Sequence, residues 1–130
     1  MNRTDIVQRL ERLNFDRAGY WLVAGGAMVL YGLREETGDI DLGCGSELAG
    51  ELERQGYPVT RMSDGTRKIQ FEAGIELFEN WLYDRVEYVE GIPVISLRGL
   101  LAMKRALGRE KDQADIKRIE DFIQKRRRIL

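Results

Sequence analysis

The stretch Tyr20-Trp-Leu-Val-Ala-Gly-Gly26 ends an apolar run on two glycines, and Asp39-Ile-Asp-Leu42 follows after a spacer of twelve residues. The run from Tyr20 to Ala24 is continuously apolar and too short for a helix of its own, which predicts a strand buried on both faces. In the second stretch, acidic and apolar residues alternate. Because successive side chains of a strand point to opposite faces, both aspartates are predicted on one face and Ile40 and Leu42 on the other.

Patterns on either side of these stretches predict the remaining elements. Helices are expected around Ile6 to Leu13, from Ala27 to Tyr31, over Glu47 to Gln55, from Leu97 to near Gly108 and around Ile116 to Ile123. Short strands are expected at Tyr57 to Arg61, Arg67 to Glu72, Ile75 to Phe78 and Val86 to Val89, with Gly91-Ile-Pro93 as a break before the last helices. The order predicts an α/β (α+β) fold with a mixed, partly antiparallel sheet of about four to six strands, helices packed on one face and C-terminal helices.

Length and composition restrict the class of protein. No composition break divides the 130 residues, so residues 1–130 are interpreted as a single domain. The net charge of −1 gives no bulk indication of nucleic-acid binding. The absence of histidine and the single cysteine, Cys44, exclude the common zinc sites, histidine-based triads and an internal disulfide. No apolar run reaches the roughly 18 residues that span a bilayer, and we expect a cytoplasmic protein that does not enter a membrane.

Gly25 and Gly26 lie between a predicted buried strand and a predicted helix start. Without side chains, they would allow a phosphate to approach backbone amides at the positive end of the helix. Two adjacent glycines are also typical of a tight turn between a strand and a helix. The glycine pair alone does not distinguish these two interpretations.

Asp39 and Asp41 carry the more specific chemistry. Two carboxylates on one face of a strand repel each other unless a cation lies between them. Magnesium prefers oxygen ligands and keeps coordination positions open for triphosphate oxygens. The pair is therefore interpreted as a site for Mg²⁺ or Mn²⁺, and the alternative is a solvated strand edge with two surface aspartates.

Ala24-Gly25-Gly26, the spacer and Asp39-Ile-Asp-Leu42 together resemble the signature of the DNA polymerase β-like nucleotidyltransferase superfamily. Arg34-Glu-Glu-Thr-Gly-Asp39 and the C-terminal stretches Leu100 to Lys104 and Gly108 to Ile116 are similar to small bacterial members, the minimal nucleotidyltransferases and those related to abortive-infection toxins. The resemblance implies the nucleotidyltransferase fold and covers most of the chain.

The resemblance also implies roles for individual residues. Asp39 and Asp41 would be catalytic metal ligands, and a third carboxylate on a later strand would complete the site. Glu76 in Ile75-Glu-Leu77 is the best candidate, although the family usually has aspartate there, and Glu72 and Glu79 are rivals. The residues expected to bind the nucleotide are Gly25, Gly26, Arg34, Thr37 and Lys104. From the residues alone, the pattern favours a surface lysine at Lys104. Arg34 would then meet either a phosphate or solvent, and Thr37 would support the loop by hydrogen bonding.

The function that the resemblance implies is metal-dependent transfer of a nucleoside monophosphate from a nucleoside triphosphate to an acceptor hydroxyl, with release of pyrophosphate. The acceptor is expected to be a protein or an RNA, with a second copy of the chain or a partner protein supplying the acceptor surface. The alternative is a nucleotidyltransferase fold with little or no turnover, which serves as a binding module in a toxin–antitoxin-like pair.

Overall fold

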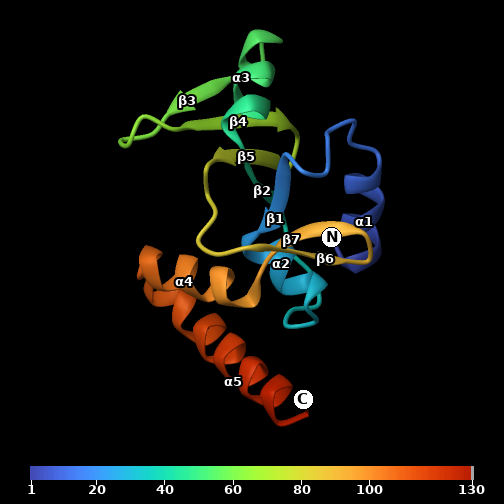
Figure 1. The fold of residues 1–130 in the computed structure, drawn as a ribbon, viewed down its shortest axis with the longest axis vertical. Coiled ribbons are helices and arrows are strands. Elements are labelled where there is room, and N and C mark those ends of the chain that lie inside the picture. Colours follow the sequence, from blue (N-terminus) through green and yellow to red (C-terminus); the bar gives the residue numbers. More distant parts are fainter. Residues whose placement is uncertain (130) are drawn as a thin grey trace.

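The computed structural model describes residues 1–129, and Figure 1 shows how their helices and strands are arranged. In chain order the elements are α1 (Arg3–Glu11), β1 (Tyr20–Val23), α2 (Ala24–Leu30), β2 (Ile40–Cys44), α3 (Ser46–Arg54), β3 (Val59–Arg61), β4 (Arg67–Glu72), β5 (Ile75–Glu79), β6 (Val86–Val89), β7 (Ile92–Ile95), α4 (Leu97–Leu107), the short 3₁₀ helix η1 (Glu110–Asp112) and α5 (Gln113–Ile129). None of these helices has the length and apolar character that crossing a bilayer requires.

The strands form one mixed sheet in the order β3-β4-β5-β2-β1-β7-β6. Strand β2 pairs antiparallel with β1 on one side and parallel with β5 on the other. The expected mixed sheet is confirmed, and the Asp39 and Ile75 segments are neighbours in it. Both depend on β2 lying in the middle of the sheet.

The sheet has seven strands, which is more than the four to six expected from the sequence. The additional strand is β7, where Pro93 had suggested a break because proline lacks a backbone N–H. All four residues of β7 are buried between β1 and β6, and Pro93 lies opposite Tyr88 of β6. Burial of this apolar segment from both sides outweighs the poor strand propensity of proline.

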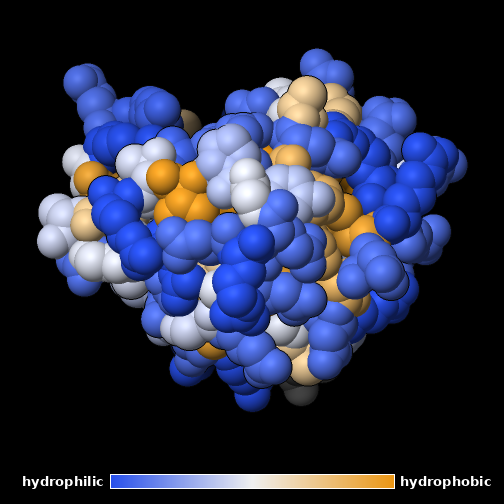
Figure 2. Space-filling view, turned by 90° about the horizontal axis from the view of Figure 1, so that it is seen from above, coloured by the Kyte–Doolittle hydropathy of each residue, from blue (hydrophilic) through white to orange (hydrophobic). Residues whose placement is uncertain are grey.

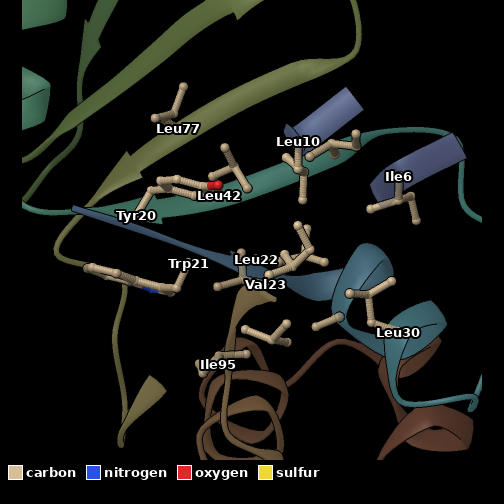
Figure 3. Close-up of a cluster of buried hydrophobic side chains, with 14 of the residues drawn as sticks. Ile6, Leu10, Tyr20, Trp21, Leu22, Val23, Leu30, Leu42, Leu77 and Ile95 are labelled. Carbon is tan, nitrogen blue, oxygen red and sulfur yellow. The ribbon is translucent and has the colours of Figure 1, made fainter. Parts of the chain in front are cut away.

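The two faces of the sheet differ in chemistry. Leu42 lies opposite Leu22 of β1 and in register with Leu77 of β5, and all three side chains are fully buried. Figure 3 shows Leu42 on the same side of β1 as Leu10 of α1, while Trp21 lies on the other side. Helices α1 and α3 contribute buried side chains to the apolar cluster. The alternation expected for Asp39 to Leu42 is therefore confirmed, because the apolar residues of β2 lie in the core.

One face of the molecule is largely hydrophilic. Viewed from above the orientation of Figure 1, hydrophilic side chains cover most of the surface, and hydrophobic side chains reach it in separate patches (Figure 2). This distribution agrees with the charged fraction of 33% in the sequence.

The two C-terminal helices pack on each other at one end of the molecule, away from β3 and β4 (Figure 1). The side chain of Ser96 caps α4 by accepting a hydrogen bond from the backbone N–H of Gly99, and α4 ends at Gly108 in the left-handed conformation. The helix expected around Ile116 is longer than its apolar pattern indicated and begins at Gln113. The turn η1 separates the two helices and places Asp112 beside α4.

Trp21 and Gly43 form a close contact on the face that carries Asp41. The two residues lie opposite each other on β1 and β2, and the indole of Trp21 covers the α-carbon of Gly43 so closely that a β-carbon at position 43 would overlap it. The Trp21 Nε1–H group donates a hydrogen bond of 2.7 Å to the carbonyl oxygen of Trp81. Trp81 in turn stacks on Phe78 of β5, with 4.3 Å between the ring centroids. Gly43 therefore allows this aromatic cluster to form.

We expect the substitution Gly43→Ala to lower the free energy of unfolding by about 1–3 kcal/mol, because the added methyl group must displace the Trp21 ring. Urea denaturation of the variant and of wild type measures this difference. Gly38→Ala is the control, since a β-carbon at position 38 meets nothing within 4 Å. Equal stability of the Gly43 variant and wild type would show that the contact with Trp21 does not exclude a β-carbon at position 43.

Candidate active site

Asp41 and Glu76 occupy matching positions on neighbouring strands. Asp41 of β2 lies in register with Glu76 of β5 and opposite Val23 of β1. Side chains of paired residues in a sheet project from the same face. Asp39 immediately precedes β2, two residues before Asp41 and exposed to solvent. Asp41 and Glu76 therefore project from one face in the middle of the sheet, and Asp39 lies just before the start of the strand that carries Asp41.

The electrostatics of Asp41 reflect these neighbours. Burial raises the pKa of its carboxyl group above the ordinary value of 3.8, and the carboxylates of Glu76 and Asp39 raise it further. The ammonium group of Lys68 partly opposes this rise in the pKa of Asp41. A half-buried carboxyl group beside two other carboxylates is costly to ionise, and a cation would reduce that cost.

Lys68 of β4 provides a positive charge on this face. Its Nζ lies 3.2 Å from Oε2 of Glu76 and 5.8 Å from the centre of the Phe78 ring. Within residues 1–129, no three acidic or cysteine side chains converge closely enough to hold a metal ion as they stand. The carboxylate oxygens of Asp39, Asp41 and Glu76 are nevertheless the donor type that Mg²⁺ and Mn²⁺ prefer. The chemistry of these donors fits the expected metal.

The rival carboxylates have other partners. Glu79 lies in register with Cys44 on the core side, is only 6% exposed, and accepts hydrogen bonds from Arg67 at 3.0 and 3.2 Å. The hydrogen bond from Arg67 is the main reason that the pKa of Glu79 lies below its ordinary value. Glu72 pairs with Arg9 of α1 at 2.9 Å. Of the three glutamates considered, Glu76 is the one in register with Asp41.

Gly25, Arg34 and Thr37 meet at the start of α2. A β-carbon on Gly25 would lie 2.8 Å from Nη1 of Arg34 and would overlap the hydroxyl group of Thr37. The hydroxyl of Thr37 also lies 3.4 Å from the backbone oxygen of Asp39, to which it donates. Three of the residues expected to bind the nucleotide are thus brought together next to the Asp39 segment.

The glycine pair was expected in a turn before the helix, but α2 begins at Ala24 and includes both glycines. The chain turns from β1 into α2 at Ala24, whose φ of 54° lies in the left-handed region that is uncommon for residues other than glycine. Gly26 has a packing role, because a β-carbon there would lie 2.7 Å from the side chain of Leu22.

Lys104 is buried inside a network of charges. It is 5% exposed, and its Nζ lies 3.4 Å from Asp112 and 3.2 Å from Asp115. Asp115 also binds Arg34, with 2.7 Å between Nη2 and Oδ2, and Arg109 binds Asp112 at 2.6 Å. Lys104 is therefore connected through Asp115 and Arg34 to the neighbourhood of Gly25. A direct contact between Lys104 and a phosphate stays a prediction.

Sequence reasoning missed Lys68 as a member of the site and missed the partners of Asp115. Lys68 and Gln70 alternate with apolar Ile69, which is the signal that could have placed them on the Glu76 face. Asp115 does not pair with a neighbour in sequence. Its actual partners come from α4 and from the loop after α2, and no local pattern indicates them.

Cys44 is buried at the end of β2. Burial is the main cause that raises the pKa of its thiol to about 12. The thiolate that a nucleophilic cysteine needs is therefore disfavoured.

Two solved structures have similar folds. The candidate nucleotidyltransferase TM1012 of Thermotoga maritima has a TM-score of 0.61 at 19% sequence identity, over 93% of this chain and 96% of that chain. The lincosamide antibiotic adenylyltransferase LnuA, in its lincomycin-bound structure, has a TM-score of 0.51 at 19% identity, over 90% of this chain and 91% of that chain. No family model matches the sequence, and no curated protein matches it. The similarity confirms the nucleotidyltransferase fold, and at this identity it shows the fold alone.

The raised pKa of Asp41 predicts a stability that depends on pH. The folded chain binds this proton more tightly than the unfolded chain, so ionised Asp41 lowers the stability at neutral pH, and this penalty disappears as the pH falls through the ordinary value of 3.8. In the presence of a chelator, we expect Asp41→Asn to be more stable than wild type at pH 7, with the difference shrinking toward pH 4. Urea denaturation across this range measures the difference.

Asp121→Asn serves as the control for this experiment, because Asp121 is exposed on α5. The control variant should differ little from wild type at any pH. A stability difference for Asp41→Asn that does not change with pH, or that grows as the pH falls, would contradict the raised pKa.

The buried position of Lys104 predicts a structural cost for its removal. Lys104→Met leaves Asp112 and Asp115 short of one cation, and we expect the free energy of unfolding to fall by about 3 kcal/mol. Lys117→Met, on the exposed side of α5, is the matched control and should have little effect. Thermal melts or urea denaturation compare the two variants. Equal effects of the two substitutions would remove Lys104 from the buried network.

Proposed function

We propose that the protein transfers a nucleoside monophosphate from a nucleoside triphosphate to an acceptor hydroxyl group in a reaction that requires Mg²⁺ or Mn²⁺. The observation that carries the proposal is the register of Asp41 with Glu76 on neighbouring strands, with Asp39 two residues away. The pattern of glycines and aspartates that resembles the nucleotidyltransferase signature occurs in the corresponding fold. Neither the pattern nor the fold alone would support the activity as strongly.

The carboxylates would hold the metal ion and receive the proton. Asp39, Asp41 and Glu76 are the proposed metal ligands, and the metal would neutralise negative charge on the triphosphate during transfer. The acceptor oxygen forms a bond to the α-phosphorus, the bond from that phosphorus to the bridging oxygen breaks, and pyrophosphate leaves. The proton of the acceptor hydroxyl passes to a carboxylate of this group, for which Glu76 is the candidate.

The residues around Gly25 would hold the triphosphate. The absence of a side chain at Gly25 already allows Arg34 and Thr37 to approach the backbone at the start of α2. Arg34 carries a guanidinium group suited to phosphate, and Asp115 orients it. Gly26 acts through close packing on Leu22, and Lys104 acts through Asp115 by fixing the position of Arg34.

The acceptor is a separate question. LnuA is named for transfer to a lincosamide antibiotic. A small molecule with a hydroxyl group is therefore a third acceptor class for this chain, beside protein and RNA. A second copy of the chain or a partner protein would supply additional acceptor surface. The alternative function, a binding module of a toxin–antitoxin-like pair with little turnover, predicts nucleotide binding without transfer.

Incubation of the protein with nucleoside triphosphates labelled at the α-phosphate, Mg²⁺ or Mn²⁺ and cell extract tests the proposal. We expect label to move to an acceptor only when metal is present, and we expect Asp41→Asn to reduce transfer by about a hundredfold or more, as loss of a principal charge-stabilising group does. Metal plus triphosphate should also raise the melting temperature of wild type, and this gain should largely disappear in the variant.

Glu72→Gln is the matched control, because Glu72 lies on a neighbouring strand and pairs with Arg9. The control should keep both the transfer activity and the gain in melting temperature. A gain in melting temperature without transfer would favour the binding module. If metal and triphosphate stabilise Asp41→Asn as much as wild type, the three carboxylates of Asp39, Asp41 and Glu76 are not the metal site.

A further inference from the structure

Lys68 interacts with the carboxylate face in two ways. In the pairing of β4 with β5, Lys68 lies opposite Phe78 and Gln70 lies opposite Glu76, so Lys68 and Glu76 are diagonal neighbours on one face. The ammonium group is 3.2 Å from Oε2 of Glu76 and 5.8 Å from the centre of the Phe78 ring. The side chains of the ion pair are 38% and 30% exposed, so solvent reaches both of them.

The other cations nearby are bound elsewhere. Arg34 pairs with Asp115 at 2.7 Å, and Arg67 pairs with Glu79 at 3.0 Å and with Glu53 at 3.1 Å. Among the ion pairs of residues 1–129, Lys68 to Glu76 is the one that brings a cation to Asp39, Asp41 or Glu76. Lys68 therefore supplies the counter-charge of this face when no metal ion is bound.

The same carboxylate has two competing uses. Glu76 cannot give Oε2 to Lys68 and serve fully as a ligand of a divalent cation beside Asp41. A partly exposed ion pair is weak, so the ammonium group can leave Glu76 at little cost. The lysine side chain is a compact charge on a flexible stem, and once released it would need a new anionic partner. A triphosphate bound with the metal offers one.

We propose that Lys68 is an exchangeable counter-ion of the carboxylates of Asp41 and Glu76. Lys68 pairs with Glu76 before metal binds, and it moves to the phosphates of the incoming nucleotide when metal takes its place. This inference rests on the proposed function and adds an order of events to it. Metal alone must displace Lys68 without compensation, whereas metal with triphosphate gives Lys68 a new partner. The two ligands therefore strengthen each other's binding, and by linkage the effect is the same in both directions.

Binding of Mn²⁺, followed by the electron paramagnetic resonance signal of the free ion, tests the inference without any measurement of activity. The proteins are wild type, Lys68→Met and Arg61→Met, each with and without a triphosphate analogue that carries a methylene group between the α- and β-phosphorus. Arg61 is the matched control, because it lies on the adjacent strand, pairs with Glu53 and loses the same charge. A thermal melt of each protein establishes that it is folded.

We expect wild type to bind Mn²⁺ weakly alone and more tightly with the analogue. Lys68→Met should bind Mn²⁺ alone roughly fivefold or more tightly than wild type, and the further gain from the analogue should shrink by a similar factor. Arg61→Met should resemble wild type in both measurements. Lys68→Gln, which also removes the charge, repeats the experiment if the methionine variant does not fold.

Two results would overturn the inference while the proposed function survives. One is Mn²⁺ affinity unchanged by the loss of Lys68, and the other is an equal increase in Lys68→Met and Arg61→Met, which would assign the effect to net charge. Absence of Mn²⁺ binding in all proteins, with and without the analogue, would instead overturn the proposed function and this inference with it. These outcomes distinguish the two failures.

Discussion

Strand β2 must be paired on both sides while its two faces meet opposite environments, and the rest of the structure depends on this constraint. Its apolar side chains Ile40, Leu42 and Cys44 are fully buried, so a shift of one residue in register would place carboxylates in the core. The hydrophobic effect therefore fixes the register of β2, and the register fixes where Asp41 lies. The position of this residue is set by forces that do not involve any ligand.

Charge networks connect α3 to this sheet and the two C-terminal helices to each other. Arg67 and Glu79 join β4 to the end of β5, and Glu53 extends the pair to α3. At the other end of the molecule, Lys104 and Asp115 connect α4 to α5. Within residues 1–129, every buried side-chain nitrogen or oxygen has a hydrogen-bond partner. Buried charges that are paired and bonded in this way resist rearrangement, because removing one partner leaves the other uncompensated.

Period-two alternation made part of this structure predictable from sequence. It was sufficient to place Asp41 and Glu76 on one face, because two apolar residues flank each of them and the core accepts only one side of each strand. Ile92 to Ile95 was misread, because the local propensity of proline opposes a strand and only the neighbouring strands β1 and β6 override it. The partners of Lys104 were also beyond sequence reasoning. Asp112 is eight residues from Lys104 in the sequence, across a turn. Arg34, which also binds Asp115, is 81 residues from Asp115 in the sequence.

The contact between Trp21 and Gly43 has an optical consequence. The chain has two tryptophans, and Trp21 donates its indole hydrogen bond to the backbone of Trp81, which stacks on Phe78. Both chromophores therefore lie in one aromatic cluster on the carboxylate face, with Phe78 two residues from Glu76 along β5. Under excitation that selects tryptophan over the five tyrosines, the emission of the protein arises entirely from this cluster. Emission intensity and wavelength consequently report on the surroundings of the carboxylates, and a change there can be followed without an attached dye.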